Sequence, residues 1–380
     1  MIAAAHPGPE SARFVSLDVF RGLTIFFMIV VNTAGPGAPA FEQLVHAPWI
    51  GFTAADAVFP SFLFAVGTAM SFAFRRPTST GRFFARILRR GALICLLGFL
   101  MYWFPFVAHQ PDGSWVWKSF GQTRFPGVLQ RIGLCYIAAA IIVRWVKDWR
   151  GVLPIAAALL LAYWAILLMF SAPGEAYTKF GNAGTLLDLK LIGADHLYKK
   201  DKGFDPEGLL STLPAIVNVL AGYLVGQAVQ ATNDKLRLVR RLTLLGGALI
   251  VVGLAWSPFF PIAKKLWSGS YVLLTIGIDM MMLGGLIALI DVRGLRMGQG
   301  FWLVLGRNPL AIYLFSELFV TTLNLFPVSG YESAYAWVGI ALFQRIAPGA
   351  VGSLLCAIAY TMVCWTVGWL LDRKGIIIKV

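Results

Sequence analysis

Residues 17–34 have the sequence LDVFRGLTIFFMIVVNTA, which is mostly apolar and close to the ~20 residues that a helix needs to cross a bilayer. Nine further hydrophobic runs follow it. They lie at about 53–74, 86–104, 126–146, 151–170, 209–230, 240–257, 270–290, 300–323 and 350–371. The sequence therefore predicts an all-α, polytopic bundle with about ten membrane spans.

The composition of the whole chain agrees with a membrane location. Of its 380 residues, 58% are hydrophobic and only 13% are charged, whereas soluble domains contain roughly 25% charged residues. A soluble fold of this size has too little interior to bury so much apolar surface. These values exclude an ordinary water-soluble enzyme and make membrane lipid an expected partner.

The segments outside the runs suggest the domain organisation. Residues 1–12 are rich in Ala and Pro and lack the features of a signal peptide, so we expect a flexible cytoplasmic tail before one transmembrane domain at 13–380. The outer loops 33–52 and 171–208 are long and polar, and such loops often carry function. At 331–345 we expect a short interfacial or re-entrant helix, with an eleventh span as the alternative.

The charge distribution predicts the orientation in the membrane. A formal net charge of +14 would suggest nucleic acid in a soluble protein. Here the loops that would face the cytoplasm hold twice as many Lys and Arg residues as the loops on the other side. The positive-inside rule then places both termini in the cytoplasm, and we expect no nucleic-acid partner. The basic cluster at 75–90 has a phosphate site as its alternative explanation.

Several common site types are absent from the sequence. Cys95, Cys135, Cys356 and Cys364 lie inside hydrophobic runs and form no CxxC pair, so no disulfide framework or metal site is expected. The chain also lacks GxSxG, HExxH, Walker and dinucleotide-binding patterns. A permease for a sugar such as N-acetylglucosamine remains an alternative function, because intramembrane charges and Gly/Pro-rich helices also suit transporters.

Polar residues around the first outer loop form the strongest candidate catalytic group. Asn32 closes the first run, His46 lies in the loop, and Asp56 opens the second run. An imidazole is suited to accept a proton near neutral pH, and a carboxamide can donate to a developing oxyanion. We predict these roles for His46 and Asn32, with Asp56 orienting the ring or holding the loop. The indole of Trp49 is a candidate substrate contact.

The same residues carry a family resemblance. They lie in seven segments that occur in order along nearly the whole chain: SLDVFRGLTIFFMIVVN (16–32), HAPWIGFTAADAVFPSFLFAVG (46–67), PGVLQRIGLCY (126–136), LLDLKLIGADHLY (186–198), FDPEGLLSTLPAIVNVLAGYLVG (204–226), PFFPIAKKLWSGSYVLLT (258–275) and GRNPLAIYL (306–314). This pattern resembles the heparan-α-glucosaminide N-acetyltransferase family, including its bacterial homologues.

The resemblance implies a multi-pass acetyltransferase of the bacterial inner membrane. It implies cytoplasmic acetyl-CoA as the acetyl donor and a saccharide or amino-sugar acceptor on the periplasmic side. It also implies that His46 is the catalytic histidine and that Asn32 and Asn308 match the family's asparagines. Whether the acetyl group passes through an acetyl-histidine or moves directly stays open.

Further polar residues are candidates for substrate or cofactor binding because ionisable groups in membrane spans are costly unless they have a role. Asp18 and Arg21 share one face of the first run and form either a binding pair or a structural ion pair. Gln130 and Arg131 begin the fourth run. We expect Arg131 to pair with Asp205 or Glu207, as a substrate site or as a buried salt bridge.

The remaining candidates are less specific. His196 lies in the second long loop and either contacts the sugar or packs the loop. Lys264 and Trp267 either hold a sugar or phosphate or anchor the chain at the membrane surface. The spacing of Gly67 and Ser71 permits close helix packing, and a homodimer is an open alternative.

Overall fold

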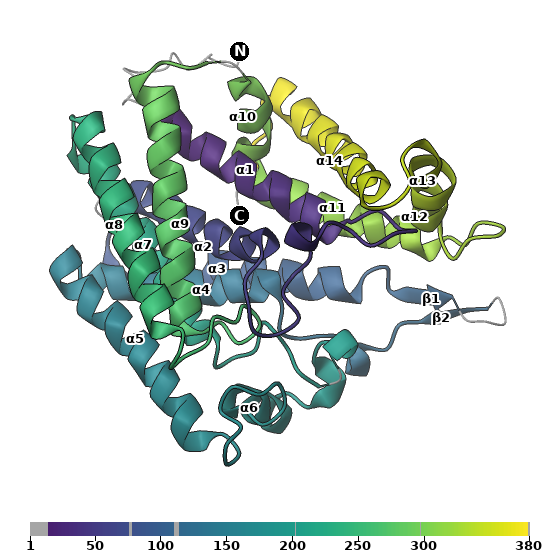
Figure 1. The fold of residues 1–380 in the computed structure, drawn as a ribbon, viewed down its shortest axis with the longest axis horizontal. Helices are drawn as coiled ribbons and strands as arrows, with labels where there is room; N and C mark the ends of the chain where they lie inside the picture. The colour runs from purple at the N-terminus through teal and green to yellow at the C-terminus, as the bar shows by residue number, and fades with distance from the viewer. Residues whose placement is uncertain (1–13, 76–77, 110–113, 202, 297, 379–380) are drawn as a thin grey trace.

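Most of the chain is helical in the computed structural model (Figure 1), which describes residues 14–75, 78–109, 114–201, 203–296 and 298–378. The predicted tail at 1–12 lies outside these residues. The helices are α1 (Val15–Asn32), α2 (Ala54–Ala73), α3 (Thr80–Trp103), α4 (Val128–Trp145), α5 (Trp149–Phe170), α6 (Ala183–Leu191), α7 (Thr212–Ala231), α8 (Lys235–Trp256), α9 (Gly269–Leu286), α10 (Gln299–Arg307), α11 (Pro309–Leu325), α12 (Ala334–Trp337), α13 (Gln344–Ile346) and α14 (Ala350–Arg373). Strands β1 (Val107–His109) and β2 (Trp115–Trp117) form a small antiparallel hairpin.

The prediction of a helical protein with several membrane spans is confirmed. Within the described part, eight helices are long and apolar enough to cross a membrane, and the pair α10–α11, bent by 81°, makes a ninth if it counts as one span. All ten predicted runs fall on helices, but α3 carries arginines throughout its first half and is not among the eight. The count of ten spans and the cytoplasmic termini stay predictions.

The segment predicted as a short interfacial helix is helical but short. It consists of α12, a π-helical stretch at Val338–Phe343 and α13, which follow one another between α11 and α14. None of these is long enough to be counted among the candidate spans of the described chain. Helices α12 and α13 lie at the right of Figure 1, next to the start of α14.

Close backbone contacts at glycines hold the central helices together. A side chain at Gly67 of α2 would collide with the carbonyl of Val219 on α7, and one at Gly222 of α7 would collide with the carbonyl of Phe64 on α2. Removing the side chain on both helices lets the two backbones approach closely. The small-residue face around Gly67 is therefore used inside the chain, and the homodimer stays a prediction.

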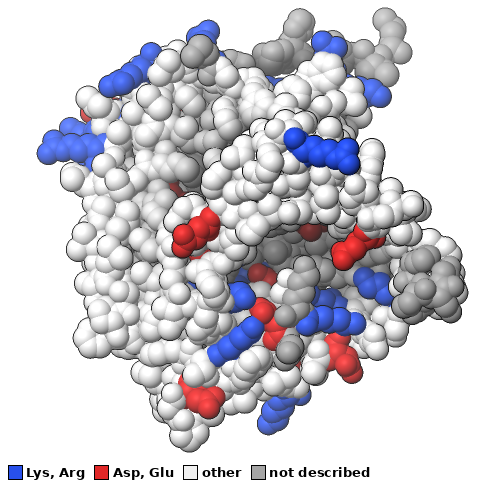
Figure 2. Space-filling model, turned by 45° about the vertical axis from the view of Figure 1, so that its right-hand side comes forward, with Lys and Arg blue, Asp and Glu red and all other residues white. Residues whose placement is uncertain are grey.

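The long outer loops and the α8–α9 connection meet at one end of the bundle. Trp49 of the first loop donates its indole N–H to the carbonyl of Tyr177 in the second loop, at 2.7 Å. Its ring also packs edge-on against Phe204, with 5.0 Å between the centroids. Figure 2 shows that acidic and basic side chains mix over this lower part of the molecule, whereas the charged residues along its upper edge are mostly Lys and Arg.

Candidate active site

His46 lies between an acid and an amine. Its Nδ1 is 2.9 Å from Oδ1 of Asp56, and its Nε2 is 2.8 Å from Nζ of Lys264. A carboxylate accepts from Nδ1–H and an ammonium donates to Nε2, so this arrangement favours the neutral tautomer with the proton on Nδ1. The side chain of His46 is 34% exposed and Asp56 is fully buried. Nε2 is therefore the basic nitrogen of the ring, and in this conformation it accepts from Lys264.

Asp56 fixes this geometry because it also begins α2. Its Oδ2 accepts from the backbone N–H of Thr53 at 3.0 Å and from that of Ala47 at 3.2 Å. The contact with the Thr53 N–H and the reciprocal contact of the Thr53 side chain with the Asp56 backbone form a capping box, whereas the contact with Ala47 holds the loop. The hydroxyl of Tyr271 on α9 donates to the carbonyl of Asp56 at 2.7 Å. One carboxylate thus holds the helix start, the loop and the histidine ring in register.

A backbone bridge brings Lys264 to the histidine. The N–H of Gly51 donates to the carbonyl of Ile262 at 2.9 Å, and Gly51 pairs with Ala263 in an isolated parallel bridge. Gly51 has φ +126°, a backbone conformation that residues other than glycine rarely adopt. The first outer loop and the α8–α9 connection are therefore joined directly beside the site. Lys264 follows this bridge and points to His46.

Burial shapes the protonation of both groups. Burial lowers the pKa of His46 below its usual value, and the charge of Lys264 adds to this effect, while Asp56 opposes it. Burial also lowers the pKa of Lys264 to about 8, although Glu207 and Asp56 favour its ammonium form. At neutral pH the site therefore holds a neutral imidazole and a protonated lysine that is easier to deprotonate than usual.

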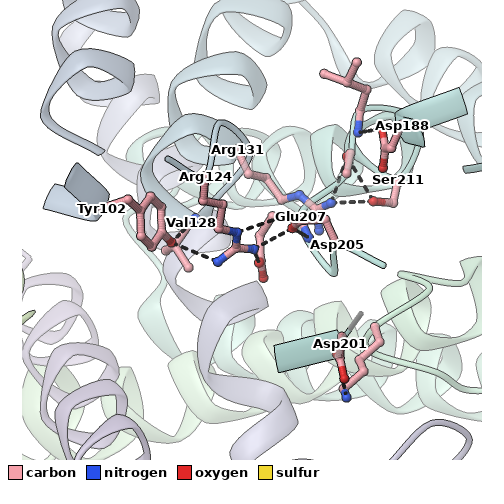
Figure 3. Close-up of polar contacts among 12 residues, drawn as sticks. Tyr102, Arg124, Val128, Arg131, Asp188, Asp201, Asp205, Glu207 and Ser211 are labelled. Carbon is pink, nitrogen blue, oxygen red and sulfur yellow. Dashed lines mark hydrogen bonds and ion pairs between the residues drawn. The ribbon is translucent and has the colours of Figure 1, made fainter. Parts of the chain in front are cut away.

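A second charged cluster centres on Arg124 (Figure 3). Its Nε and Nη2 donate to the two carboxylate oxygens of Asp205 at 2.8 and 2.5 Å, and Nη2 also donates to Glu207 at 2.5 Å. Its Nη1 is 3.3 Å from the hydroxyl of Tyr102. The Arg124 side chain is only 12% exposed. Arg124 thus forms a buried bidentate ion pair with Asp205 and a second ion pair with Glu207, which the planar guanidinium can make at the same time.

The prediction that Arg131 pairs with Asp205 or Glu207 was wrong, because Arg124 binds both acids. Arg131 instead donates from Nη2 to the carbonyl of Gly208 at 3.1 Å and to the hydroxyl of Ser211. Its guanidinium lies 4.7 Å from the ring centre of Trp267. The charge of Arg131 still acts on Glu207. Arg124 stands in a loop segment, so nothing in its sequence context marked it as the buried partner.

Glu207 connects the two groups electrostatically. Burial would raise its pKa, but the charges of Arg124, Arg131 and Lys264 lower it below the usual value of a glutamate. Glu207 is therefore ionised at neutral pH. Its charge also acts on His46, which it helps to protonate. Glu207 therefore links the Arg124 cluster to the pair of Lys264 and His46 through its charge.

Asn32 lies in a different contact from the one expected. Its Nδ2 donates to Oε1 of Glu317 on α11 at 3.0 Å. Next to it, the hydroxyl of Tyr335 donates to the carbonyl of Thr33 at 2.6 Å, which fixes the end of α1. The amide is therefore directed at a carboxylate in this conformation. Its role as an oxyanion donor stays a proposal, which would use the second N–H of the amide.

Two cavities lie toward the other end of α2. The larger has a volume of about 480 Å³ and is lined by four cationic residues, Arg75, Arg86, Arg144 and Lys147, and by no acid among the residues that the structure describes. The smaller, about 120 Å³, contains Arg21 and Arg90 at an otherwise mainly apolar wall. Arg86 and Arg90 are one turn apart on α3, so the cavities follow one another along this helix.

The other predicted residues have mainly structural contacts. Asp18 pairs with Arg21 within α1, as expected from their spacing. The ring of His196 stacks on Phe125 at 3.9 Å and its Nδ1 is 2.7 Å from the carbonyl of Thr123, which matches loop packing.

The remaining candidates are buried between helices. Asn308 is buried and bonds to the backbone of Ile376 and Ile378. Trp267 is fully buried and donates to Asn218, and Gln130 is buried between α3 and α4. No metal-binding group was found among the described residues.

Comparison with known proteins gives one consistent match. The family model for the catalytic region of heparan-α-glucosaminide N-acetyltransferase matches residues 13–260. The human heparan-α-glucosaminide N-acetyltransferase is 28% identical over 378 aligned positions, which cover 83% of this chain and 54% of the human protein. The mouse protein of the same name is also 28% identical, with the same coverage. The chain thus spans about half the length of these relatives.

Proposed function

The chain belongs to the heparan-α-glucosaminide N-acetyltransferase family, and from this premise we propose that it transfers acetyl from acetyl-CoA to the amino group of a saccharide across a membrane. The observation that carries the proposal is the contact of His46 with Asp56 and Lys264. It gives a neutral imidazole whose Nε2 carries the free lone pair, on a side chain that is 34% exposed. That atom can serve as a general base or as a nucleophile in acyl transfer.

Acetyl transfer at this site has two chemically complete routes. In the first, His46 Nε2 takes the proton of an acceptor amine while the amine attacks the thioester carbonyl. In the second, Nε2 attacks the thioester and carries the acetyl group before passing it on. Asp56 supports both routes because it holds the ring and opposes the positive charge that develops on it.

The cavities at the opposite end of α2 support a donor site. The four cations around the larger cavity suit the phosphates of acetyl-CoA, and the smaller cavity, with Phe62, Ile94 and Ile132 in its wall, suits the pantetheine arm. Phe62 is six residues beyond Asp56 on α2, about 9 Å along the helix axis. The thioester would therefore approach His46 along α2 from the basic side.

The outer loops support an acceptor site. Glu207, which is ionised and lies within electrostatic range of His46, offers an acceptor for the hydroxyl or amino groups of a sugar, and Trp49, three residues after His46 in the same loop, is half-exposed and can stack on a sugar ring. This assignment places the acceptor on the periplasmic side of a bacterial inner membrane and acetyl-CoA on the cytoplasmic side. The greater number of basic residues in the loops of the donor side agrees with that orientation.

The test is acetyl transfer by the purified full chain. The protein in detergent is incubated with acetyl-CoA and a panel of amino sugars, and the products are identified by mass spectrometry. We expect an acetylated amino sugar with the wild-type chain and at least a ~10²-fold lower rate with His46→Ala. Equal rates for both chains would refute the role of His46. Uptake of N-acetylglucosamine into vesicles without acetyl-CoA, with no transfer, would support the permease alternative instead.

A further inference from the structure

The contact between Lys264 and His46 occupies the atom at which acetyl transfer would take place. Lys264 Nζ is 2.8 Å from Nε2 of His46, whereas the next residue, Lys265, pairs with Asp201 at 3.1 Å. The neutral ring has one lone pair on Nε2, and either an acetyl carbon or an incoming proton must use it. When reaction begins, Lys264 must leave this lone pair, yet its backbone keeps it beside the reacting atoms.

We propose that Lys264 is a catalytic residue that gives a proton to the departing sulfur of acetyl-CoA and regains a proton from the acceptor nitrogen. This inference rests on the proposed function and names a second reacting group in the same site. A lysine that only anchored the chain at a membrane surface would point outward. Lys264 points inward, to the one ring nitrogen that Asp56 leaves free.

Direct transfer balances with one proton shuttled by Lys264. The acceptor nitrogen forms a bond to the acetyl carbon, the C–S bond breaks, and its electron pair leaves on sulfur, which takes the Lys264 proton. His46 Nε2 takes the proton that the acceptor nitrogen loses. This proton then moves from His46 to the neutral Lys264 across their hydrogen bond. The products are an amide and a thiol, and both side chains regain their first protonation state.

The covalent route uses the same proton. Nε2 forms a bond to the acetyl carbon, the C–S bond breaks, and the sulfur takes the Lys264 proton. The positive charge on the acetylated ring is opposed by Asp56. The acceptor nitrogen next bonds to the acetyl carbon, the bond to Nε2 breaks with its electron pair returning to the ring, and Lys264 takes the proton from that nitrogen. Lys264 has the same function in both routes.

The charges around Lys264 make it a suitable acid. Burial lowers its pKa to about 8, and the neighbouring Lys265 and Arg131 on α4 act in the same direction. Glu207 before α7 and Asp56 on α2 oppose them. A free thiol has a pKa of about 8.5, so donor and acceptor are closely matched, which favours proton transfer in both directions.

The experiment compares Lys264→Ala with the control Lys190→Ala, which removes an exposed lysine of α6 in the second outer loop. Both variants of the full chain are purified, and kcat and KM for acetyl transfer are measured from pH 5.5 to 9.5. We expect kcat of Lys264→Ala to fall by about 10²–10⁴-fold, with loss of the alkaline limb near pH 8 and partial rescue by trimethylamine, which carries a proton but forms no stable amide. Lys190→Ala should stay within about threefold of wild type.

Three outcomes are decisive. The proposal fails if Lys264→Ala keeps the wild-type kcat and pH profile, or if only its KM changes. If that variant does not fold, as judged by gel filtration and thermal unfolding, Lys264→Arg decides, because arginine keeps the charge and the donors but does not release its proton. An unchanged kcat for Lys264→Arg would also overturn the proposal. A wild-type chain that transfers no acetyl group refutes the proposed function itself, whatever the variants do.

Discussion

Asp56 bonds to His46 with one carboxylate oxygen, Oδ1 at 2.9 Å from Nδ1, and uses the other to cap α2. The orientation of the ring is therefore coupled to the start of a membrane helix rather than to a mobile loop. A change at Asp56 has two separable effects, one on the tautomer of the ring and one on the helix cap. This coupling gives the first prediction.

Asp56→Asn should reduce kcat by about 10²–10⁴-fold, since an amide can donate to Nδ1 and would then favour the tautomer with its proton on Nε2. KM for acetyl-CoA should change by less than about threefold. Initial rates of acetyl transfer measure both constants. Thr53→Ala is the control because it weakens the same cap and leaves the carboxylate in place. A similar loss of kcat in both variants would show that the cap, and not the tautomer, explains the effect.

The pH dependence of kcat/KM should be bell-shaped. Activity requires neutral His46, whose pKa is lowered by burial, so the acid limb should lie below pH 6.5. It also requires protonated Lys264, whose pKa burial lowers to about 8, so activity should fall as the pH rises through about 8. Rates from pH 5 to 10 at low substrate concentration measure this profile. A rate that still increases above pH 9 would contradict it.

The basic cavity should select the nucleotide part of acetyl-CoA. The double variant Arg86→Gln and Arg144→Gln removes two of its four cations. We expect KM for acetyl-CoA to rise at least about tenfold, because each charge-assisted bond to phosphate contributes roughly 1–3 kcal/mol. KM for S-acetyl-pantetheine, which has no phosphate, should stay unchanged.

Arg240→Gln is the matched control for that experiment, since Arg240 is exposed on α8 and does not line the cavity. It should leave both KM values within about twofold of wild type. Equal increases for acetyl-CoA and S-acetyl-pantetheine in the double variant would place the phosphates elsewhere.

The Arg124 cluster should be important for stability. Arg124→Met would leave the buried carboxylates of Asp205 and Glu207 without their guanidinium, and breaking a buried pair in this way costs about 3–5 kcal/mol. Thermal unfolding in detergent should show a clear decrease in Tm. Arg237→Met removes an exposed pair with Asp234 and should change Tm very little. An Arg124→Met chain as stable as wild type would show that the acids are not ionised together.

The sequence predicts contacts best when the partners are close along the chain. His46 and Asp56 are ten residues apart and lie on either side of a helix start, so their pairing follows from local structure. The contact of Lys264 with His46 joins residues 218 positions apart. It depends on the backbone hydrogen bond between Gly51 and Ile262, which no periodicity in the sequence indicates.

The same limit explains the two arginines. Arg131 is inside a hydrophobic run, so it was expected to need an acid. Its positive charge is instead accommodated by a carbonyl, a hydroxyl and the face of Trp267. Arg124 precedes the run and resembles an ordinary loop charge, yet the second outer loop folds over it and buries it. Burial of loop residues is a property of the tertiary structure, which hydropathy does not report.

The single run predicted at 300–323 is also two helices in the structure. Asn308 precedes Pro309, and a residue before proline is disfavoured in the helical conformation. The chain accordingly turns by 81° between α10 and α11. Hydropathy averaged over the segment shows that it is apolar but does not detect such a break.

The break at Asn308 has a practical consequence for handling the protein. Its side chain bonds to the backbone of Ile376 and Ile378, so this segment stabilises the corner between α10 and α11. Deletion clones that stop near Gly375 would remove both of these contacts and disturb that corner. Expression vectors for this chain should therefore include the sequence through Ile378.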